Sequence, residues 1–219
     1  MIDANLAGKA AAYLHQLCVE IPNRRLGTPG NRAATGWFAR AITGLGFRTE
    51  CPEFACLDWV SEGASLRLGG LEFDLRVSPY SLGCRGAAPL VAASTLAGLE
   101  AMDAAGKVLL VHGDLSRESL MPKNFPFYNP EEHQRLVALL EAKAPLAVIS
   151  ATAWNPDLAG AVYPCPLIND GDFLVPAGHL TVEEGERLAA LAGETAHIEL
   201  CSGRTPAKGV NVVARRGPA

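Results

Sequence analysis

A glycine pair between two alternating runs is the feature that most restricts how this 219-residue chain folds. Apolar and polar residues alternate through residues 65–68 and again through 71–75, and Gly69-Gly70 lies between the runs. A two-residue loop that needs positive φ accepts glycine at both positions, so the pattern predicts a β-hairpin. Alternate side chains of a strand share a face, and we expect this face to be buried. It comprises Leu66, Leu68, Leu71 and Phe73.

Helical periodicity precedes the hairpin. Residues 4–20 place apolar side chains at steps of three and four, and Pro22 ends the segment. A second helix is predicted over residues 31–45, with Asn31 as its cap and Trp37 on its apolar face. The two predicted helices are joined by a loop that contains glycine and proline.

Short strands and two further helices follow the hairpin. Strands are predicted over residues 88–92, 107–112, 146–150, 196–201 and 210–214, and helices over 130–143 and 181–191. The fold class is therefore α+β: two N-terminal helices, then a β-rich region. His179, which follows Pro-Ala-Gly, is expected in a turn, and His133 is expected to be a surface or hydrogen-bonded polar residue.

Composition excludes several classes of protein. Nineteen Lys and Arg against 23 Asp and Glu give a net charge of −4, which disfavours a nucleic-acid binder. The longest apolar stretches, such as residues 108–111, are far shorter than the ~18 residues that a membrane span needs. The N-terminus has no secretory pattern, so we expect a cytoplasmic protein with reduced thiols. The six cysteines lack zinc-site spacing and are interpreted as small buried hydrophobes.

Three segments, in this order, resemble one family of enzymes. The stretch Arg24-x-x-Gly27-Thr28-Pro29-Gly30-Asn31 resembles the N-terminal signature of co-catalytic zinc exopeptidases of the bacterial aminopeptidase and glutamate carboxypeptidase II type. Residues 78–81, 89–91 and 106–111 resemble the protease-associated insert of those enzymes. Residues 209–214, Gly-Val-Asn-Val-Val-Ala, resemble the Asn-Val strand that opens their main catalytic sheet.

The resemblance implies a division of the chain and a reaction. Residues 1–48 would be helices of the catalytic α/β layer, 49–203 a protease-associated-like insert, and 204–219 the start of a catalytic-sheet strand. In such enzymes two zinc ions activate a bridging water that attacks a peptide bond, and a glutamate is the general base. Their metal ligands follow the Asn-Val strand, and this sequence ends at Ala219. The resemblance thus implies an N-terminal portion without its own catalytic centre or zinc, whose insert acts as a lid or specificity surface.

The loop before the second helix is the candidate substrate-cleft segment. In the resembled enzymes it borders the cleft, and the residues carried over are Arg24, Gly27, Thr28 and Asn31. An arginine there would pair with a carboxylate through two hydrogen bonds. The structural alternative is a helix–helix connector, in which glycine and proline fix the turn and Asn31 caps the helix.

One literal metal-site pattern is present, His112-Gly113-Asp114. Residues two apart on a strand point to the same face, so both could reach one ion. Further ligands could be drawn from Asp157, Glu183, Glu184 and His197. However, the pattern precedes the Asn-Val strand instead of following it, and the glutamate pair fits a helix start, where the helix dipole favours acids. No metal site is therefore predicted in this chain.

Two other functions stay open at this point. The chain could be a stand-alone interaction module of the protease-associated type without catalysis, or a small metal-hydrolase that uses His112 and Asp114. The apolar run Val210–Val213 suggests a strand buried on both faces. If the rest of its sheet is missing, an apolar patch around Trp37 and Val212 would be exposed and could mediate homo-oligomer formation.

Overall fold

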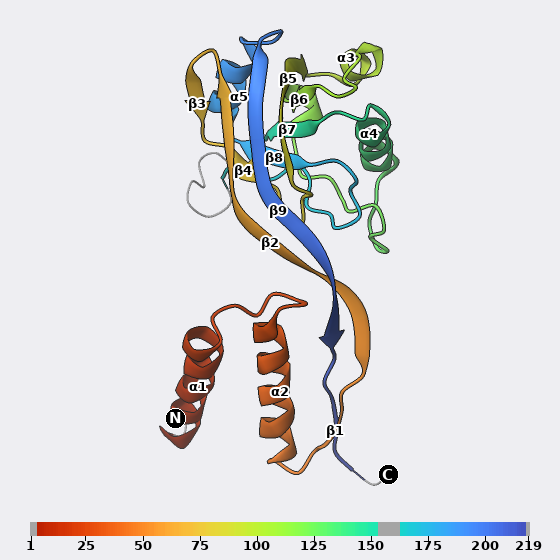
Figure 1. The fold of residues 1–219 in the computed structure, drawn as a ribbon. Helices are drawn as coiled ribbons and strands as arrows, with labels where there is room; N and C mark the ends of the chain where they lie inside the picture. The colour runs from red at the N-terminus through yellow and green to blue at the C-terminus, as the bar shows by residue number, and fades with distance from the viewer. Residues whose placement is uncertain (1–3, 153–162, 218–219) are drawn as a thin grey trace. The chain divides into compact units, whose positions relative to one another are not determined.

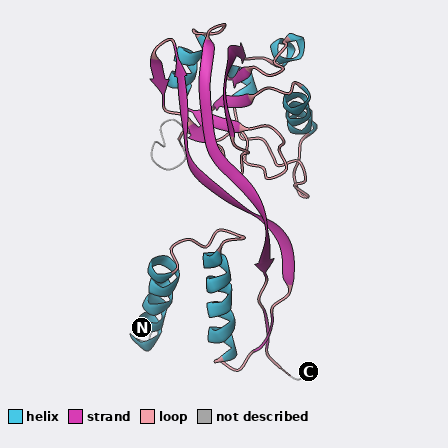
Figure 2. Ribbon diagram, in the orientation of Figure 1, coloured by secondary structure: helices cyan, strands magenta, loops and turns pink. Residues whose placement is uncertain are grey.

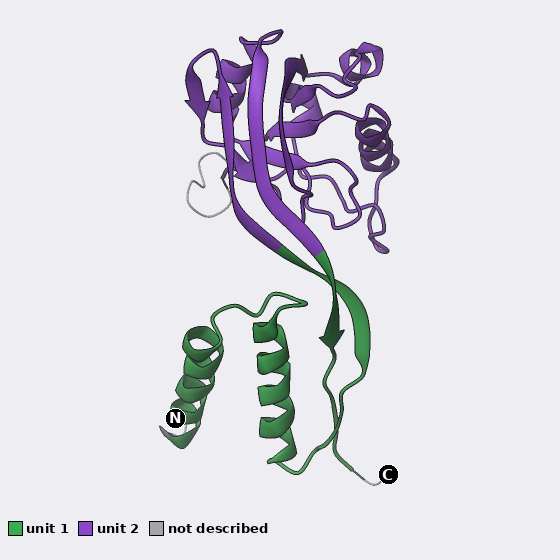
Figure 3. Cartoon of the chain, in the orientation of Figure 1, with its two compact units in different colours: residues 1–59, 205–219 green, residues 60–204 purple. Residues whose placement is uncertain are grey.

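The computed structural model describes residues 4–152 and 163–217, which form an α+β fold (Figures 1 and 2). The chain divides into two compact units (Figure 3). Unit 1 contains Met1–Trp59 and Thr205–Ala219, and unit 2 contains Val60–Arg204. Within the described ranges, no helix is long and apolar enough to cross a membrane.

Unit 1 consists of two helices and a small sheet. Helix α1 spans Ala4–His15 and continues as a π-helical turn over Gln16–Glu20, and α2 spans Pro29–Thr43. Strand β1, Arg48–Glu50, pairs antiparallel with β10, Val213–Arg215. The two predicted helices are therefore present. The single strand predicted over residues 210–214 is wrong, because Val210 ends β9 and β10 begins only at Val213. Tyr13 of α1 stacks edge-on against Trp37 of α2, with ring centroids 5.3 Å apart.

The apolar side chains of unit 1 are mostly accessible to solvent. Val213 is 37% exposed, and Val210 and Val212 are half-buried. Val213 is accessible because its strand, β10, has a single paired neighbour, the three-residue β1. Trp37 is half-buried against Tyr13. Large exposed apolar residues of this unit are Leu6, Leu14, Val19, Phe38 and Leu45.

Unit 2 is built on an eight-stranded sheet with the order β3-β2-β9-β5-β6-β7-β8-β4. Two long strands extend from unit 1 into it, β2 (Glu53–Leu68) and β9 (Thr195–Val210). The other strands are β3 (Leu71–Phe73), β4 (Arg76–Val77), β5 (Cys84–Ala93), β6 (Val108–Val111), β7 (Ala147–Ala151) and β8 (Ala177–Leu180). The helices are α3 (Leu96–Ala101), α4 (Glu131–Ala142) and α5 (Val182–Ala189), with a 3-10 turn over Gly113–Ser116.

The predicted hairpin is present between β2 and β3. Leu66 pairs with Phe73 and Leu68 with Leu71, and both turn glycines have positive φ, 55° for Gly69 and 77° for Gly70. Leu66, Leu68 and Phe73 are buried as predicted, but Leu71 is 43% exposed, so its predicted burial is wrong. Leu71 lies in β3, an edge strand of the sheet, whereas its partner Leu68, which is 1% exposed, lies in β2, which has a neighbouring strand on each side.

Four neighbouring strands, β5 to β8, run parallel to one another. Parallel strands need crossover connections, and α3 and α4 lie in the connections that follow β5 and β6. All residues of β6 and β7 are buried, as is typical of parallel strands covered on both faces. The sequence predicted these strands but not their direction.

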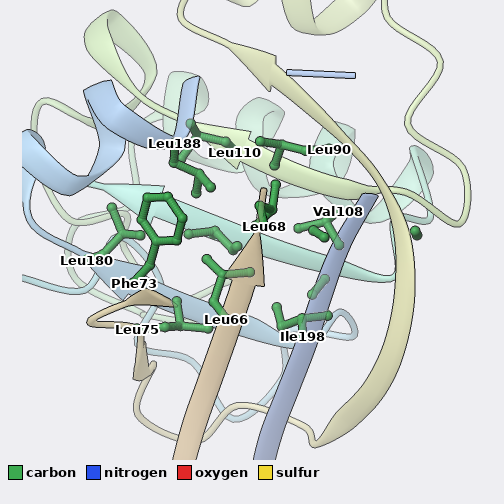
Figure 4. Close-up of a cluster of buried hydrophobic side chains, with 14 of the residues drawn as sticks. Leu66, Leu68, Phe73, Leu75, Leu90, Val108, Leu110, Leu180, Leu188 and Ile198 are labelled. Carbon is green, nitrogen blue, oxygen red and sulfur yellow. The ribbon is translucent and has the colours of Figure 1, made fainter. Parts of the chain in front are cut away.

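Alternating side chains of the parallel strands enter two separate cores. Leu110 and Ile149 pack with the hairpin and with Leu188 of α5 in one core (Figure 4). Leu109 and Val148 point to the other, which contains residues of α3, α4 and the loop before β8: Leu99, Leu136, Leu140 and Phe173. The sheet is thus a layer between two apolar cores.

The sheet of unit 2 curls around the first of these cores. Its edge strands are β3 and β4, yet only Asp74 and Leu75 separate them in the chain. A flat sheet of eight strands would hold its edges about 34 Å apart, far beyond the reach of two residues. The edges therefore approach each other, and Phe73 and Leu75 both enter the enclosed core.

His179 lies in β8 and not in a turn, so that prediction is wrong. It is opposite Arg76 of β4, and Gly178 beside it allows β4 to approach: a Cβ at Gly178 would lie 3.0 Å from the Arg76 carbonyl oxygen. The imidazole is buried, and its Nδ1 has no hydrogen-bond partner in the described part of the chain. Burial, with a smaller effect of Arg76, lowers the His179 pKa from 6.5 to about 4.

Candidate functional site

The candidate cleft loop, residues 24–31, ends in a helix cap. Thr28 has an extended backbone, and its Oγ1 accepts the Asn31 N–H at 3.1 Å and donates to the Arg25 carbonyl at 2.6 Å. Pro29 occupies the first helical position, where its fixed φ suits the helix. The cap is therefore Thr28, and the predicted Asn31 cap is wrong. Asn31 lies in the first turn of α2, and its N–H donates to the hydroxyl oxygen of the capping Thr28.

Two glycines of this loop allow close backbone approaches. Gly27 has φ of +86°, and a Cβ there would lie 3.0 Å from backbone atoms of Asp58 and Leu57. At Gly30 an added Cβ would lie 1.8 Å from the Asn23 carbonyl oxygen. Both positions accept only glycine without a shift of the backbone.

The two arginines of the loop have different surroundings. Arg25 pairs with Asp58 of β2 (Nη2 to Oδ1, 3.2 Å), and its guanidinium lies 5.7 Å from the ring centroid of Trp59. Arg24 is exposed and donates from Nη1 to the Ile21 carbonyl at 2.9 Å. Within residues 4–152 and 163–217, Arg24 forms no ion pair. It is thus the arginine available to a carboxylate.

The four residues carried over by resemblance therefore divide into two kinds. Gly27 and Thr28 are buried and shape the loop. Asn31 Nδ2 donates to the Arg24 carbonyl at 3.4 Å, which places these two residues side by side. The Arg25–Asp58–Trp59 arrangement was not predicted, because its partners lie 33 positions apart and no local pattern joins them.

The His112-x-Asp114 pattern does not form a shared face. Strand β6 ends at Val111, and Gly113, with φ of +60°, begins a 3-10 turn that contains Asp114. The Asp114 carboxylate accepts a hydrogen bond from Arg117. The assumption that both residues continue the strand is therefore wrong.

The other residues of that hypothetical metal set have separate partners. Tyr163 donates to Glu183, which holds the Glu183 pKa below its usual value, and Glu184 pairs with Arg187. Thr181 caps α5 as predicted. His197 is an exposed residue of β9, and Asp157 lies outside the described residues.

The fit to zinc can be tested on the donor groups. Across the described ranges, no three His, Cys, Asp or Glu side chains lie close enough together to hold a metal ion. All six cysteines are free, but their interpretation as buried hydrophobes is wrong, because two are exposed and four are half-buried. Burial raises the pKa of Cys84 to about 11, which disfavours the thiolate that metals bind. The described residues therefore do not fit a pair of zinc ions.

No family model and no curated protein sequence matches this chain. Several solved structures are similar to this chain. An aminopeptidase from Aneurinibacillus sp. strain AM-1 has a TM-score of 0.66 at 19% identity, over 95% of this chain and 48% of that one. The zinc aminopeptidase BSAP from Bacillus subtilis has a TM-score of 0.64 at 20% identity, over 97% and 47%. A peptidase M28 precursor from Shewanella amazonensis SB2B has a TM-score of 0.59 at 18% identity, over 95% and 51%.

These similarities concern the fold. Nearly all of this chain superposes on each structure, and the chain spans about half the length of the structures it matches.

Proposed function

We propose that this chain is part of a zinc-dependent exopeptidase of the aminopeptidase type. The observation that carries the proposal is the similarity of at least 95% of the chain to three peptidase structures, in each of which about half the length is matched. Three ordered segments of the sequence independently resemble the same family. The substrate class is peptides with a free terminus.

Each unit receives a role in this proposal. Residues 1–48 and 204–219 contribute helices and a strand to the catalytic layer, and residues 49–203 are a protease-associated-like insert that acts as a lid or specificity surface. The proposal is supported by the division of contacts, because α2, β1 and β10 belong to one compact unit while Val60–Arg204 form another. The exposed apolar side chains of unit 1 would be covered by the remainder of the catalytic layer or by a second copy.

The catalytic centre is assigned to residues outside this chain. The described residues do not fit the two zinc ions, so no chemical step is assigned to any of them. Arg24 is proposed to bind a carboxylate of the peptide at the edge of the cleft, since it is exposed and has no ion-pair partner in the described ranges.

Metal content and peptidase activity test this division directly. The purified 219-residue chain should contain no stoichiometric zinc and should not hydrolyse aminoacyl p-nitroanilides. The longer gene product that includes it should contain about two zinc ions and hydrolyse the same reporters, as two-metal chemistry requires. Zinc with turnover in the short chain would overturn the assignment of the centre. A longer product without hydrolysis would overturn the exopeptidase proposal and favour an interaction module.

The role of Arg24 has its own test in the longer protein. Arg24→Gln should raise KM for a peptide with a free carboxylate by about tenfold, the effect of losing ~1.4 kcal/mol of binding, and leave kcat unchanged. Arg40→Gln, on the exposed surface of α2, is the matched control and should change neither constant. If Arg24→Gln and Arg40→Gln have the same KM and kcat, Arg24 does not bind the carboxylate of the substrate.

A further inference from the structure

A cavity of about 430 Å³ lies in unit 2, beside the 3-10 turn at residues 113–116 and the first turns of α4. Its volume is at the small end of the ~300–1,000 Å³ range of ligand sites. Leu96, Leu115, Leu120 and Leu136 line it, and the last three are at most 8% exposed. An apolar side chain of a ligand would therefore find an apolar wall here.

A buried histidine directs one carboxylate toward this cavity. His133 is 7% exposed, and its Nδ1 accepts the Met121 N–H at 3.1 Å. The proton of the neutral ring is therefore on Nε2, which lies 3.4 Å from Oε1 of Glu118. The Glu118 side chain is 70% exposed, so this imidazole positions a carboxylate that solvent and ligands can reach.

Two guanidinium groups also line the cavity. Arg117 pairs with Asp114 and Arg135 pairs with Glu100, and more than 60% of each arginine side chain is exposed. Exposed ion pairs contribute only ~0–1 kcal/mol, so either guanidinium can exchange its partner for a ligand carboxylate at little cost. A planar guanidinium binds such a carboxylate through two parallel hydrogen bonds.

The charges of the lining indicate which ligand fits. Three acids line it, Asp114, Glu118 and Glu132, together with the two arginines. Within residues 4–152 and 163–217, Glu132 forms no ion pair. This mixture disfavours a phosphate or another simple anion, because carboxylates would repel it, and disfavours a simple cation, because guanidinium groups would. A zwitterion satisfies both signs.

We propose that this cavity binds a free α-amino acid with an aliphatic side chain, such as leucine. The ammonium group binds the Glu118 carboxylate that His133 positions, the carboxylate binds Arg117 or Arg135, and the side chain packs on the leucines. The proposal does not rest on the peptidase function, although in an aminopeptidase such a ligand would be a reaction product.

Titration of the 219-residue chain with amino acids tests the site. L-leucine should bind saturably, with chemical-shift changes at His133 and Leu136 in NMR spectra. Glycine, N-acetyl-leucine and leucinamide, which lack the side chain, the ammonium and the carboxylate respectively, should each bind about tenfold more weakly, a loss of ~1.4 kcal/mol. No saturable binding at millimolar leucine, or shift changes confined to other parts of the chain, would overturn the proposal.

Variants locate the binding groups. Glu118→Gln and the double variant Arg117→Gln/Arg135→Gln should each weaken leucine binding by about tenfold, or ~1.4 kcal/mol. The matched controls are Glu72→Gln and Arg67→Gln, which remove an exposed pair of the hairpin with an N–O distance of 2.8 Å, and both should bind leucine normally. Thermal unfolding of every variant verifies the fold. If the cavity variants bind leucine as tightly as the controls, the site is refuted.

Discussion

Unit 2 buries both faces of its parallel strands, whereas unit 1 leaves most of its apolar helix surface in solvent. In the described ranges, every buried apolar side chain except Ile21 belongs to unit 2. Unit 1 nevertheless has a side-chain cap at the start of α2 and a tightly packed loop before it, so this local structure is specified without a core. The two units therefore differ in how their elements are stabilised, since most helix stability in proteins comes from the packing of an apolar face, which unit 1 largely lacks.

The largest contrast should appear when one leucine in each unit is shortened. Leu110→Ala removes a fully buried side chain between β5 and β7 and should lower the free energy of unfolding by about 2–5 kcal/mol. Leu14→Ala, at a position 63% exposed on α1, should change it by less than about 0.5 kcal/mol. Urea titrations followed by circular dichroism measure both. Equal losses would contradict the division into a core-bearing and a coreless unit.

Acid should destabilise unit 2 through His179. Its folded pKa of about 4 lies below the unfolded value of ~6.5, so the unfolded state binds a proton that the folded state releases. Stability is therefore complete above pH ~6.5 and falls as the pH drops toward 4, by about 3 kcal/mol at most. Arg76 opposes the protonated ring and Asp74 favours it.

The matched variant for this prediction is His179→Gln, which cannot titrate. The difference in unfolding free energy between wild type and variant should decrease between pH 6.5 and 4, because the carboxylates shared by both proteins cancel. A difference that stays constant over this range would show that His179 is not the responsible group.

Two glycines of unit 1 sharpen the comparison within that unit. Gly30→Ala forces a Cβ against the Asn23 carbonyl and should destabilise the start of α2 by about 1–3 kcal/mol. Gly8→Ala, in α1 with no atom within 4 Å of the added Cβ, should stabilise its helix by up to about 1 kcal/mol. Amide exchange over each helix measures the two effects. Unchanged exchange of the α2 amides in Gly30→Ala would contradict the close approach of Gly30 to the Asn23 carbonyl.

The smallest expected effect concerns the ion pair between Arg25 and Asp58. Both side chains are partly exposed, 34% and 26%, so a double-mutant cycle with Arg25→Gln and Asp58→Asn should give a coupling below about 1 kcal/mol. A larger value would mean that this pair, together with the contact to Trp59, replaces the core that unit 1 lacks.

Local patterns predicted the local structure well. The Gly69-Gly70 hairpin, the two N-terminal helices and the Thr181 cap all follow from residues close together in the chain. The predicted burial of Leu71 was wrong because β3 is an edge strand of the sheet, and alternation alone does not show which strand lies at an edge. Thr28 replaced Asn31 as the cap because Pro29 fixes where α2 begins.

Contacts between residues far apart in the chain were largely not predicted from the sequence. One feature of the sequence reflects the parallel direction of β5 to β8: the residues of β6 and β7 are apolar apart from Ser150, which is typical of strands covered on both faces. No pattern in the sequence predicted the pairing of Arg25 with Asp58 or the cavity next to His133, because each joins residues that only the fold brings together. For the same reason, the His112-x-Asp114 spacing suggested a metal face that the turn at Gly113 removes.

Hydrogen exchange of the 219-residue chain tests the central claim, that a complete module is joined to part of a catalytic layer, most directly. Amides of β6 and β7 should exchange only through unfolding of unit 2. Amides of α1 and α2 should exchange at least about 100-fold faster, which corresponds to a local stability lower by about 2.7 kcal/mol. In a longer protein that joins this chain to the rest of the proposed catalytic layer, the same helices should become as protected as the strands. Helices of the short chain that exchange as slowly as β6 and β7 would contradict the account.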